Sequence, residues 1–330
     1  MLRSIFILLL STHSLVAQEM DSTSYTLFKD KIVLYTDLGF NSAPFNIKDD
    51  FVGGFDKLQY KHNLKATMGL GVIYKWFALR IGIALPGTLR NRQKFGQTNY
   101  LDLGLNFNLN KTYWALDLRN YKGYVIKDAY RWDDSLSAEI PHSIRPNTRS
   151  TSVSMNVWYH FNEQFRMPAV LGKVGHYDKA EGTFYLRNTL NIFGVGTDSI
   201  PLVSSQLIDT VQNKSSVHTI SALDLGIIPG YAYVNRINNW QFSVFGGVGG
   251  VIQSKFLSSD KGTRGFLGVA PRFDLRLQAG YSKNRYFFLL VSEFDFKSIS
   301  VQEMSYFQTY YTIRATAGIR LNKKKSKSRI

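Results

Sequence analysis

The chain has 330 residues, no Cys and a formal net charge of +16. The absence of Cys excludes disulfides and thiolate chemistry, and no apolar run after residue 17 reaches the roughly 18 residues that a membrane helix requires. A basic chain invites a nucleic-acid interpretation. However, outside the C-terminal residues the charges are spread singly, without a recognisable nucleic-acid-binding motif, so we predict no nucleic-acid partner.

The N-terminus has the layout of a cleavable secretory signal. Arg3 precedes the apolar run from Ile5 to Leu10, and small and polar residues follow up to Ala17. We therefore predict a signal peptide over 1–17, secretion across the inner membrane and a polar lead-in on the periplasmic side over 18–30. The mature chain keeps 39 basic residues against 24 acidic ones, once Arg3 is removed from the 40 of the full sequence.

From residue 31 to residue 322 apolar and polar residues alternate with a period of two, which is typical of β-strands with two different faces. Twelve strands are predicted in chain order: 31–40, 58–74, 77–85, 100–109, 113–121, 150–161, 164–195, 217–232, 239–252, 271–281, 286–297 and 309–321. Many of them approach or exceed the nine to eleven residues that a tilted strand needs to cross an outer membrane.

The clearest hairpin lies between Pro271 and Phe296. Its first strand places Phe273, Leu277 and other apolar residues on one face and charged residues such as Arg272 on the other. A polar turn at 282–285 then leads into a second strand of the same kind. Apolar residues facing lipid and polar residues facing a lumen would explain this pattern.

The length of the connections predicts the orientation, because outer-membrane barrels have short periplasmic turns and longer external loops. Short turns are predicted at 74–76, 109–112, 162–164, 233–238 and 282–285, and long loops at 41–57, 86–98, 122–149, 196–216, 256–264 and 298–308. Short and long connections alternate only if 164–195 counts as one spanning strand, which gives 12 strands. A further strand near 202–211 would instead give 14. We predict 12, with both termini in the periplasm.

The predicted fold class is therefore all-β, a transmembrane antiparallel β-barrel of about 12 strands in the outer membrane. The barrel spans 31–322, and the basic residues of 323–330 form a periplasmic tail next to anionic surfaces. The partners expected for such a protein are outer-membrane lipid and the barrel-assembly machinery.

Several strand motifs resemble an uncharacterised family of outer-membrane barrels, domain of unknown function 4421. The motifs are Tyr100–Asn110 (YLDLGLNFNLN), Trp114–Leu118 (WALDL), Tyr121–Tyr124 (YKGY), Tyr74–Phe77 (YKWF) and Pro271–Leu277 (PRFDLRL). The resemblance covers most of the mature chain and implies the location and the fold. It implies no catalytic or binding residues.

Motifs for cofactor or metal chemistry are incomplete. The glycines of Gly246–Gly250 do not complete a nucleotide-binding motif, and a bend in the barrel wall explains them. The five His residues after the signal (His62, His142, His160, His176 and His218) show no metal-ligand spacing. We predict no cofactor, no metal and no enzymatic activity. The alternative is a lipid-modifying enzyme that uses Ser152, Ser154 and His160, but Ser154 and His160 are about 20 Å apart along one strand.

The inward charges are the candidate functional set. They either pair across the lumen and close it, or leave a small channel whose selectivity they set. The predicted function is accordingly a structural protein or a small-solute pore, with a slight preference for anions because seven residues are basic and five acidic. The lumen-lining residues are Arg80, Asp102, Asp117, Arg119, Arg187, Arg272, Asp274, Arg276, Glu293, Asp295, Arg314 and Arg320.

Overall fold

The computed structural model describes residues 24–63, 66–87, 90–109, 111–198, 200–208, 216–302 and 304–322. The predicted signal peptide, residues 18–23 of the predicted lead-in and the basic tail lie outside these residues. Within them, no helix is long and apolar enough to cross a membrane.

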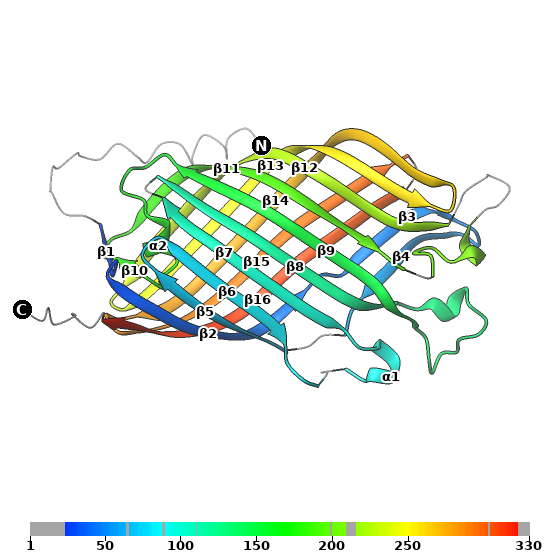
Figure 1. Ribbon diagram of the computed structural model, residues 1–330, viewed down its shortest axis with the longest axis horizontal. Coiled ribbons are helices and arrows are strands. Elements are labelled where there is room, and N and C mark those ends of the chain that lie inside the picture. Colours follow the sequence, from blue (N-terminus) through cyan, green and yellow to red (C-terminus); the bar gives the residue numbers. More distant parts are fainter. Residues whose placement is uncertain are drawn as a thin grey trace, which may run out of the picture.

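Twelve antiparallel strands close into one ring, as the alternating sequence predicted. The strands cross the elongated molecule obliquely (Figure 1), and the last strand pairs with the first, so that Arg320 faces Val33. The strands of the ring are β2 (Lys31–Ser42), β5 (Ala66–Tyr74), β6 (Phe77–Ala84), β7 (Asn99–Leu109), β8 (Thr112–Ile126), β9 (Ser143–His160), β11 (Glu181–Gly196), β12 (Val217–Ile237), β13 (Trp240–Ser259), β14 (Gly262–Ser282), β15 (Tyr286–Val301) and β16 (Met304–Asn322).

The two faces of the wall follow the predicted alternation. On β14, Leu277 is 46% exposed and Phe273 is 39% exposed, whereas Arg272 is 1% exposed. The apolar face therefore points outward, where lipid would cover it, and the charged face points into the barrel.

We name the two ends of the barrel by what they carry. The termini end carries Lys31, Asn322 and the turns at 75–76 and 283–285. The loop end carries the connections that contain α1 (Arg92–Phe95), η1 (Ala129–Arg131) and η2 (Ser205–Leu207). In Figure 1 the termini end lies at the left and the loop end at the right.

The ring narrows toward the loop end. Strand β3 (Phe45–Phe51) continues β2 along β16 in the same register, since Ser42 faces Tyr311 and Phe45 faces Gln308. Strand β4 (Phe55–Lys61) returns beside β3 and pairs with β8 beyond the ends of β6 and β7. At the loop end the ring therefore runs through β16, β3, β4, β8, β9 and β11 to β15, which is ten strands.

Hydrogen bonds fix the place where the wall changes from twelve strands to ten. The backbone N–H of Asn63 donates to the Thr98 hydroxyl (3.0 Å), and this hydroxyl donates to the carbonyl of Gly123 (2.8 Å). Gly123 has φ +95°, and a Cβ there would lie 2.0 Å from the carbonyl oxygen of Gln97. Only glycine fits this close approach without strain.

The segment 161–180 folds back into the termini end of the barrel. It contains α2 (Met167–Val170) and β10 (Gly175–Tyr177), and β10 pairs with β1 (Tyr25–Leu27) of the lead-in. The predicted tight turn at 162–164 is therefore wrong, because the connection between β9 and β11 runs over 161–180. The predicted spanning strand over 164–195 is wrong for its residues up to 180. Only β11 spans, and the preceding residues form an inserted segment, because their apolar side chains pack inside the barrel.

An apolar cluster fills the loop end. Its side chains come from opposite sides of the ring, including Phe45 and Tyr60 of the β3–β4 hairpin, Phe193 of β11 and Tyr306 of β16. Leu202 and Leu207, from the connection around η2, complete the cluster. A strand near 202–211, which 14 strands would require, is absent from the described part of that stretch, 202–208, which contains η2 and irregular chain.

Three predicted long loops are wrong. Residues 41–57 are mostly in β2, β3 and β4, and 256–264 and 298–308 are mostly strand, with a tight turn at 260–261. The strands continue there beyond the length that a bilayer requires. Charged residues such as Lys48, Asp49 and Asp50 interrupt the apolar pattern there, so the sequence resembles that of a loop, although side chains such as Phe45 and Tyr306 point into the loop-end cluster.

Candidate functional site

A polar chamber lies between the two filled ends of the barrel. Its volume is about 180 Å³, which is below the roughly 300–1,000 Å³ of typical small-molecule sites. Charged side chains from most of the ring strands line it. The basic residues are Arg80, Arg119, Lys173, Arg187, Arg276, Lys297 and Arg314, and the acidic residues are Asp102, Asp117, Asp274, Glu293 and Asp295.

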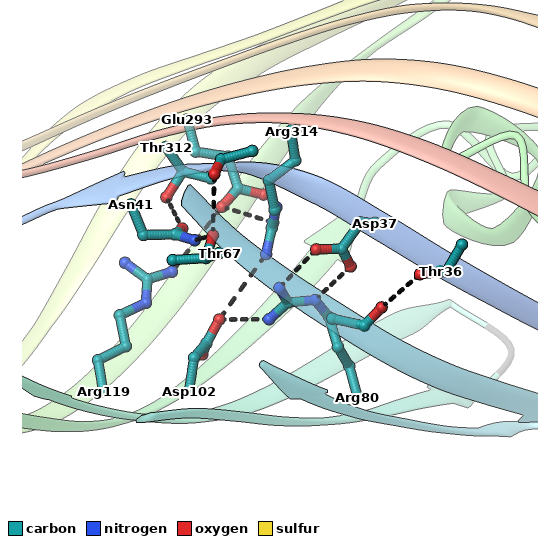
Figure 2. A network of polar contacts seen from close by, with 12 residues as sticks. Thr36, Asp37, Asn41, Thr67, Arg80, Asp102, Arg119, Glu293, Thr312 and Arg314 are labelled. Carbon is teal, nitrogen blue, oxygen red and sulfur yellow. Dashed lines mark hydrogen bonds and ion pairs between the residues drawn. The ribbon is translucent and has the colours of Figure 1, made fainter. Parts of the chain in front are cut away.

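Arg80 connects two carboxylates on one side of the chamber (Figure 2). Its guanidinium donates to both carboxylate oxygens of Asp37, at 2.7 and 2.8 Å, and also to Asp102. All three side chains are buried. Charge-assisted hydrogen bonds of this two-pronged kind are among the strongest in proteins, so Arg80 holds β2, β6 and β7 together from the inside.

Glu293 occupies the opposite side of the same network. It accepts from Arg314 at 3.3 Å, lies 3.1 Å from Arg276 and 3.8 Å from Arg119. Arg314 also lies 3.8 Å from Asp102, so the two carboxylates are joined across the lumen through one guanidinium (Figure 2). The network crosslinks strands that are far apart in sequence.

Further pairs line the rest of the chamber. Arg187 lies 3.0 Å from Asp274, and Lys297 lies 3.7 Å from Asp295. The Lys297 ammonium also donates to the Ser152 hydroxyl at 2.9 Å. Most charges of the chamber are therefore neutralised by a neighbour, as buried charges require.

Ten of the twelve residues predicted to line the lumen lie on this chamber. The other two are inside the barrel but elsewhere. Arg272 pairs with Asp224 under the loop-end cluster, and both side chains are at most 2% exposed. Arg320 lies at the termini end, where it donates to the carbonyls of Lys173 and Gly172, both at 2.6 Å.

Sequence reasoning did not assign two further cations to the chamber. Lys297 belongs to the inward face of β15, so the alternation could have identified it. Lys173 belongs to the inserted segment, and its ammonium lies 4.0 Å from the centre of the Tyr35 ring. Among the described residues neither Lys173 nor Asp117 forms an ion pair, so these two charges face the chamber directly.

The inserted segment is bound mainly by long polar side chains of the wall. The Gln241 amide donates to the carbonyls of Ala169 (3.0 Å) and Val170 (2.8 Å), and Gln278 donates to Val170 (3.1 Å). Within the segment, Phe165 and Val170 are buried. These contacts satisfy backbone carbonyls of a segment that is buried inside the barrel.

The structure separates the residues of the hydrolytic alternative. Ser152 and Ser154 line the chamber, whereas His160 lines a second pocket at the termini end. Within the described part of the chain, no group of three or more His, Asp or Glu side chains is arranged to hold a metal ion.

Residues 19–320 match the family described as domain of unknown function (DUF4421), and the chain belongs to this family. The class of protein that the closed strand ring defines is thus a transmembrane β-barrel of an uncharacterised outer-membrane family. A comparison with curated proteins gave no match.

The solved structures that are similar in outline include three outer-membrane proteins. The outer membrane protease OmpT from Escherichia coli has 9% identity and a TM-score of 0.41, with 91% of this chain and 99% of that chain covered. The translocator domain of the autotransporter NalP from Neisseria meningitidis has 10% identity and a TM-score of 0.44, with 88% of each chain covered. An outer membrane channel from Pseudomonas putida F1 has 9% identity and a TM-score of 0.32, with 91% and 100% covered.

Proposed function

We propose that this protein is a closed outer-membrane barrel with a structural, non-catalytic role. The observation that carries the proposal is the filling of the lumen at both ends, by the loop-end cluster and by the inserted segment, with only a small chamber between them. An open diffusion pore would need a continuous aqueous path past both. Outer-membrane lipid and the barrel-assembly machinery are its proposed partners.

We also propose that the termini end faces the periplasm. The turns at 75–76, 238–239 and 283–285 are short and lie at this end, while the connections with α1, η1 and η2 lie at the other. Short periplasmic turns and longer external loops are the usual arrangement of outer-membrane barrels. The chain would reach the membrane through its predicted signal peptide, and fractionation of cells tests this location.

A gated small-solute pore is the second candidate, favoured by the excess of basic over acidic side chains on the chamber wall. Such a pore would open when the inserted segment is displaced, with the loop-end cluster opening as a consequence. Its selectivity would favour small anions.

Conductance across planar lipid bilayers separates the two candidates. The purified barrel is compared with Gln241→Leu/Gln278→Leu, which removes the side-chain donors that hold Ala169 and Val170, and heat-modifiable gel migration confirms folding of each sample. A structural barrel is expected to give no steady conductance in either form, because the loop-end cluster remains. Steady channels from the unmodified protein would overturn the structural proposal, and channels from the double variant alone would support the gated pore.

A further inference from the structure

A second pocket opens at the termini end, outside the chamber network. Its volume is about 430 Å³, which falls within the range of small-molecule sites. Its walls come from the lead-in, from the turn between β5 and β6, from the ends of β7 and β8, and from the inserted segment. Four aromatic side chains line it: Tyr25, Phe28, Trp76 and Tyr113.

The charge of this pocket is mainly positive. Four basic side chains, Lys29, Lys31, Lys75 and Arg166, face one acidic side chain, Asp30. The Lys31 ammonium is fixed by the carbonyl of Asn284 at 2.9 Å. Lys29 and Lys75 are exposed at the mouth and, among the described residues, form no hydrogen bond or ion pair. An anionic group of a ligand would find these two ammonium groups available.

Two buried polar atoms on the inner wall have no hydrogen-bond partner within the described residues. They are Nε2 of His160, a side chain that is 4% exposed, and Oδ1 of Asn108. Both residues line the pocket. A buried polar atom without a partner costs about 1–3 kcal/mol. A ligand with a hydroxyl group could satisfy both atoms.

The position of Trp76 indicates how a ligand enters. Trp76 is 53% exposed and stacks on Phe107, at 5.8 Å between ring centroids, on the outward face of the ring. Exposed Trp side chains at the end of a membrane barrel lie at the level of the lipid headgroups. Since Trp76 also lines the pocket, the pocket borders the headgroup level of the membrane.

We propose that this pocket binds a phosphate ester that carries hydroxyl groups, supplied by the headgroup of an anionic glycerophospholipid. The phosphate contacts Lys29 and Lys75, and the headgroup hydroxyls reach Asn108 and His160. The assignment of this lipid to the periplasmic leaflet rests on the orientation proposed above, whereas the binding itself does not.

Native mass spectrometry of the full-length barrel in detergent tests the proposal. The probes are phosphatidylglycerol, zwitterionic phosphatidylcholine and, as a soluble phosphate ester, glycerol 3-phosphate. Lys29→Gln/Lys75→Gln is expected to retain roughly tenfold less phosphatidylglycerol than the unmodified protein, because two charge-assisted contacts are lost. Lys94→Gln, an exposed lysine of α1 at the loop end, is the matched control and is expected to change nothing.

His160→Leu distinguishes specific binding inside the pocket from nonspecific electrostatic attraction to the lysines. It removes the unpartnered nitrogen and leaves both lysines in place. It is expected to reduce phosphatidylglycerol retention in a sample whose heat-modifiable migration is normal. Retention of phosphatidylglycerol without glycerol 3-phosphate binding supports the lipid source, and competition between the two supports a free phosphate ester. Equal retention of the two lipids by the unmodified protein, or equal retention by the lysine variant and Lys94→Gln, would overturn the proposal whatever the conductance experiments show.

Discussion

Replacement of Arg80 by Met tests the ion-pair network of the chamber most directly. Asp37 is 2% exposed, and Arg80 is the ion-pair partner that the described residues provide for it. Loss of the guanidinium leaves this carboxylate buried and unpaired, which costs about 3–5 kcal/mol when one side of a buried pair is removed. Asp102 keeps Arg314 at 3.8 Å, so most of the cost is expected at Asp37.

The assay is urea unfolding in lipid vesicles, followed by Trp fluorescence. Arg80→Met/Asp37→Leu removes both charges and is expected to return to within about 1 kcal/mol of the unmodified protein, because apolar replacements of a buried pair are often neutral. Lys111→Gln breaks an exposed pair with Glu163 and is expected to leave the unfolding free energy unchanged within error. A double variant no more stable than Arg80→Met would refute the reasoning.

Three further changes test other parts of the barrel. Leu277→Arg places a charge on the lipid-facing side of β14 and is expected to lower the unfolding free energy by about 2–4 kcal/mol, with Leu277→Met as control. Burial lowers the pKa of His62 to about 4 from 6.5. The folded state therefore favours the neutral ring, and its contribution to stability is full above pH 6.5 and is lost as the pH falls to 4, by about 3 kcal/mol. His62→Gln is expected to flatten this pH profile. Gly123→Ala is expected to cost about 1–3 kcal/mol through backbone strain, and an unchanged denaturation midpoint would contradict the close packing against Gln97.

The ring of strands was predictable because a bilayer imposes a strict pattern on a barrel wall. Lipid requires apolar side chains on one face, and closure requires the other face to point inward, so the period of two persists along β14 and β16. Leu277 faces outward toward lipid, and Arg272 faces into the barrel. The number of strands was predicted from the same pattern together with an expected alternation of short turns and long loops, and it is confirmed although three of those loops are strands in the structure.

The connections were less predictable because the bilayer no longer constrains them. Beyond the membrane, both faces of β13 and β14 meet water, and Ser258 to Arg264 therefore has the composition of a loop although it forms a hairpin. Conversely, Phe165 to Val170 has the apolar character of a strand, but it is covered by the inside of the barrel instead of by lipid.

The chamber contacts could not be derived from the sequence, although the alternation identifies which residues point inward. Ion pairs such as Arg80 with Asp37 depend on the register between neighbouring strands. Those of Glu293 depend on how far apart the walls are, which is a property of the closed ring. The pocket at the termini end requires knowledge of where the inserted segment and the lead-in pack.

The geometry of the ring itself explains why the lumen contains inserted parts of the chain. Side chains alone fill a barrel of about eight strands, and the interior widens as strands are added. This wall has twelve strands at the termini end and ten at the loop end. The side chains of the wall therefore do not fill the interior at either end by themselves. The inserted segment fills the wider end, and the connection around η2 with the β3–β4 hairpin fills the narrower one. Between them the remaining space is a chamber in which most charges are paired with a neighbour of opposite sign. A channel is therefore not needed to explain a polar interior. A polar network that crosslinks strands on opposite walls stabilises a wide barrel whose hydrophobic surface is turned outward to lipid.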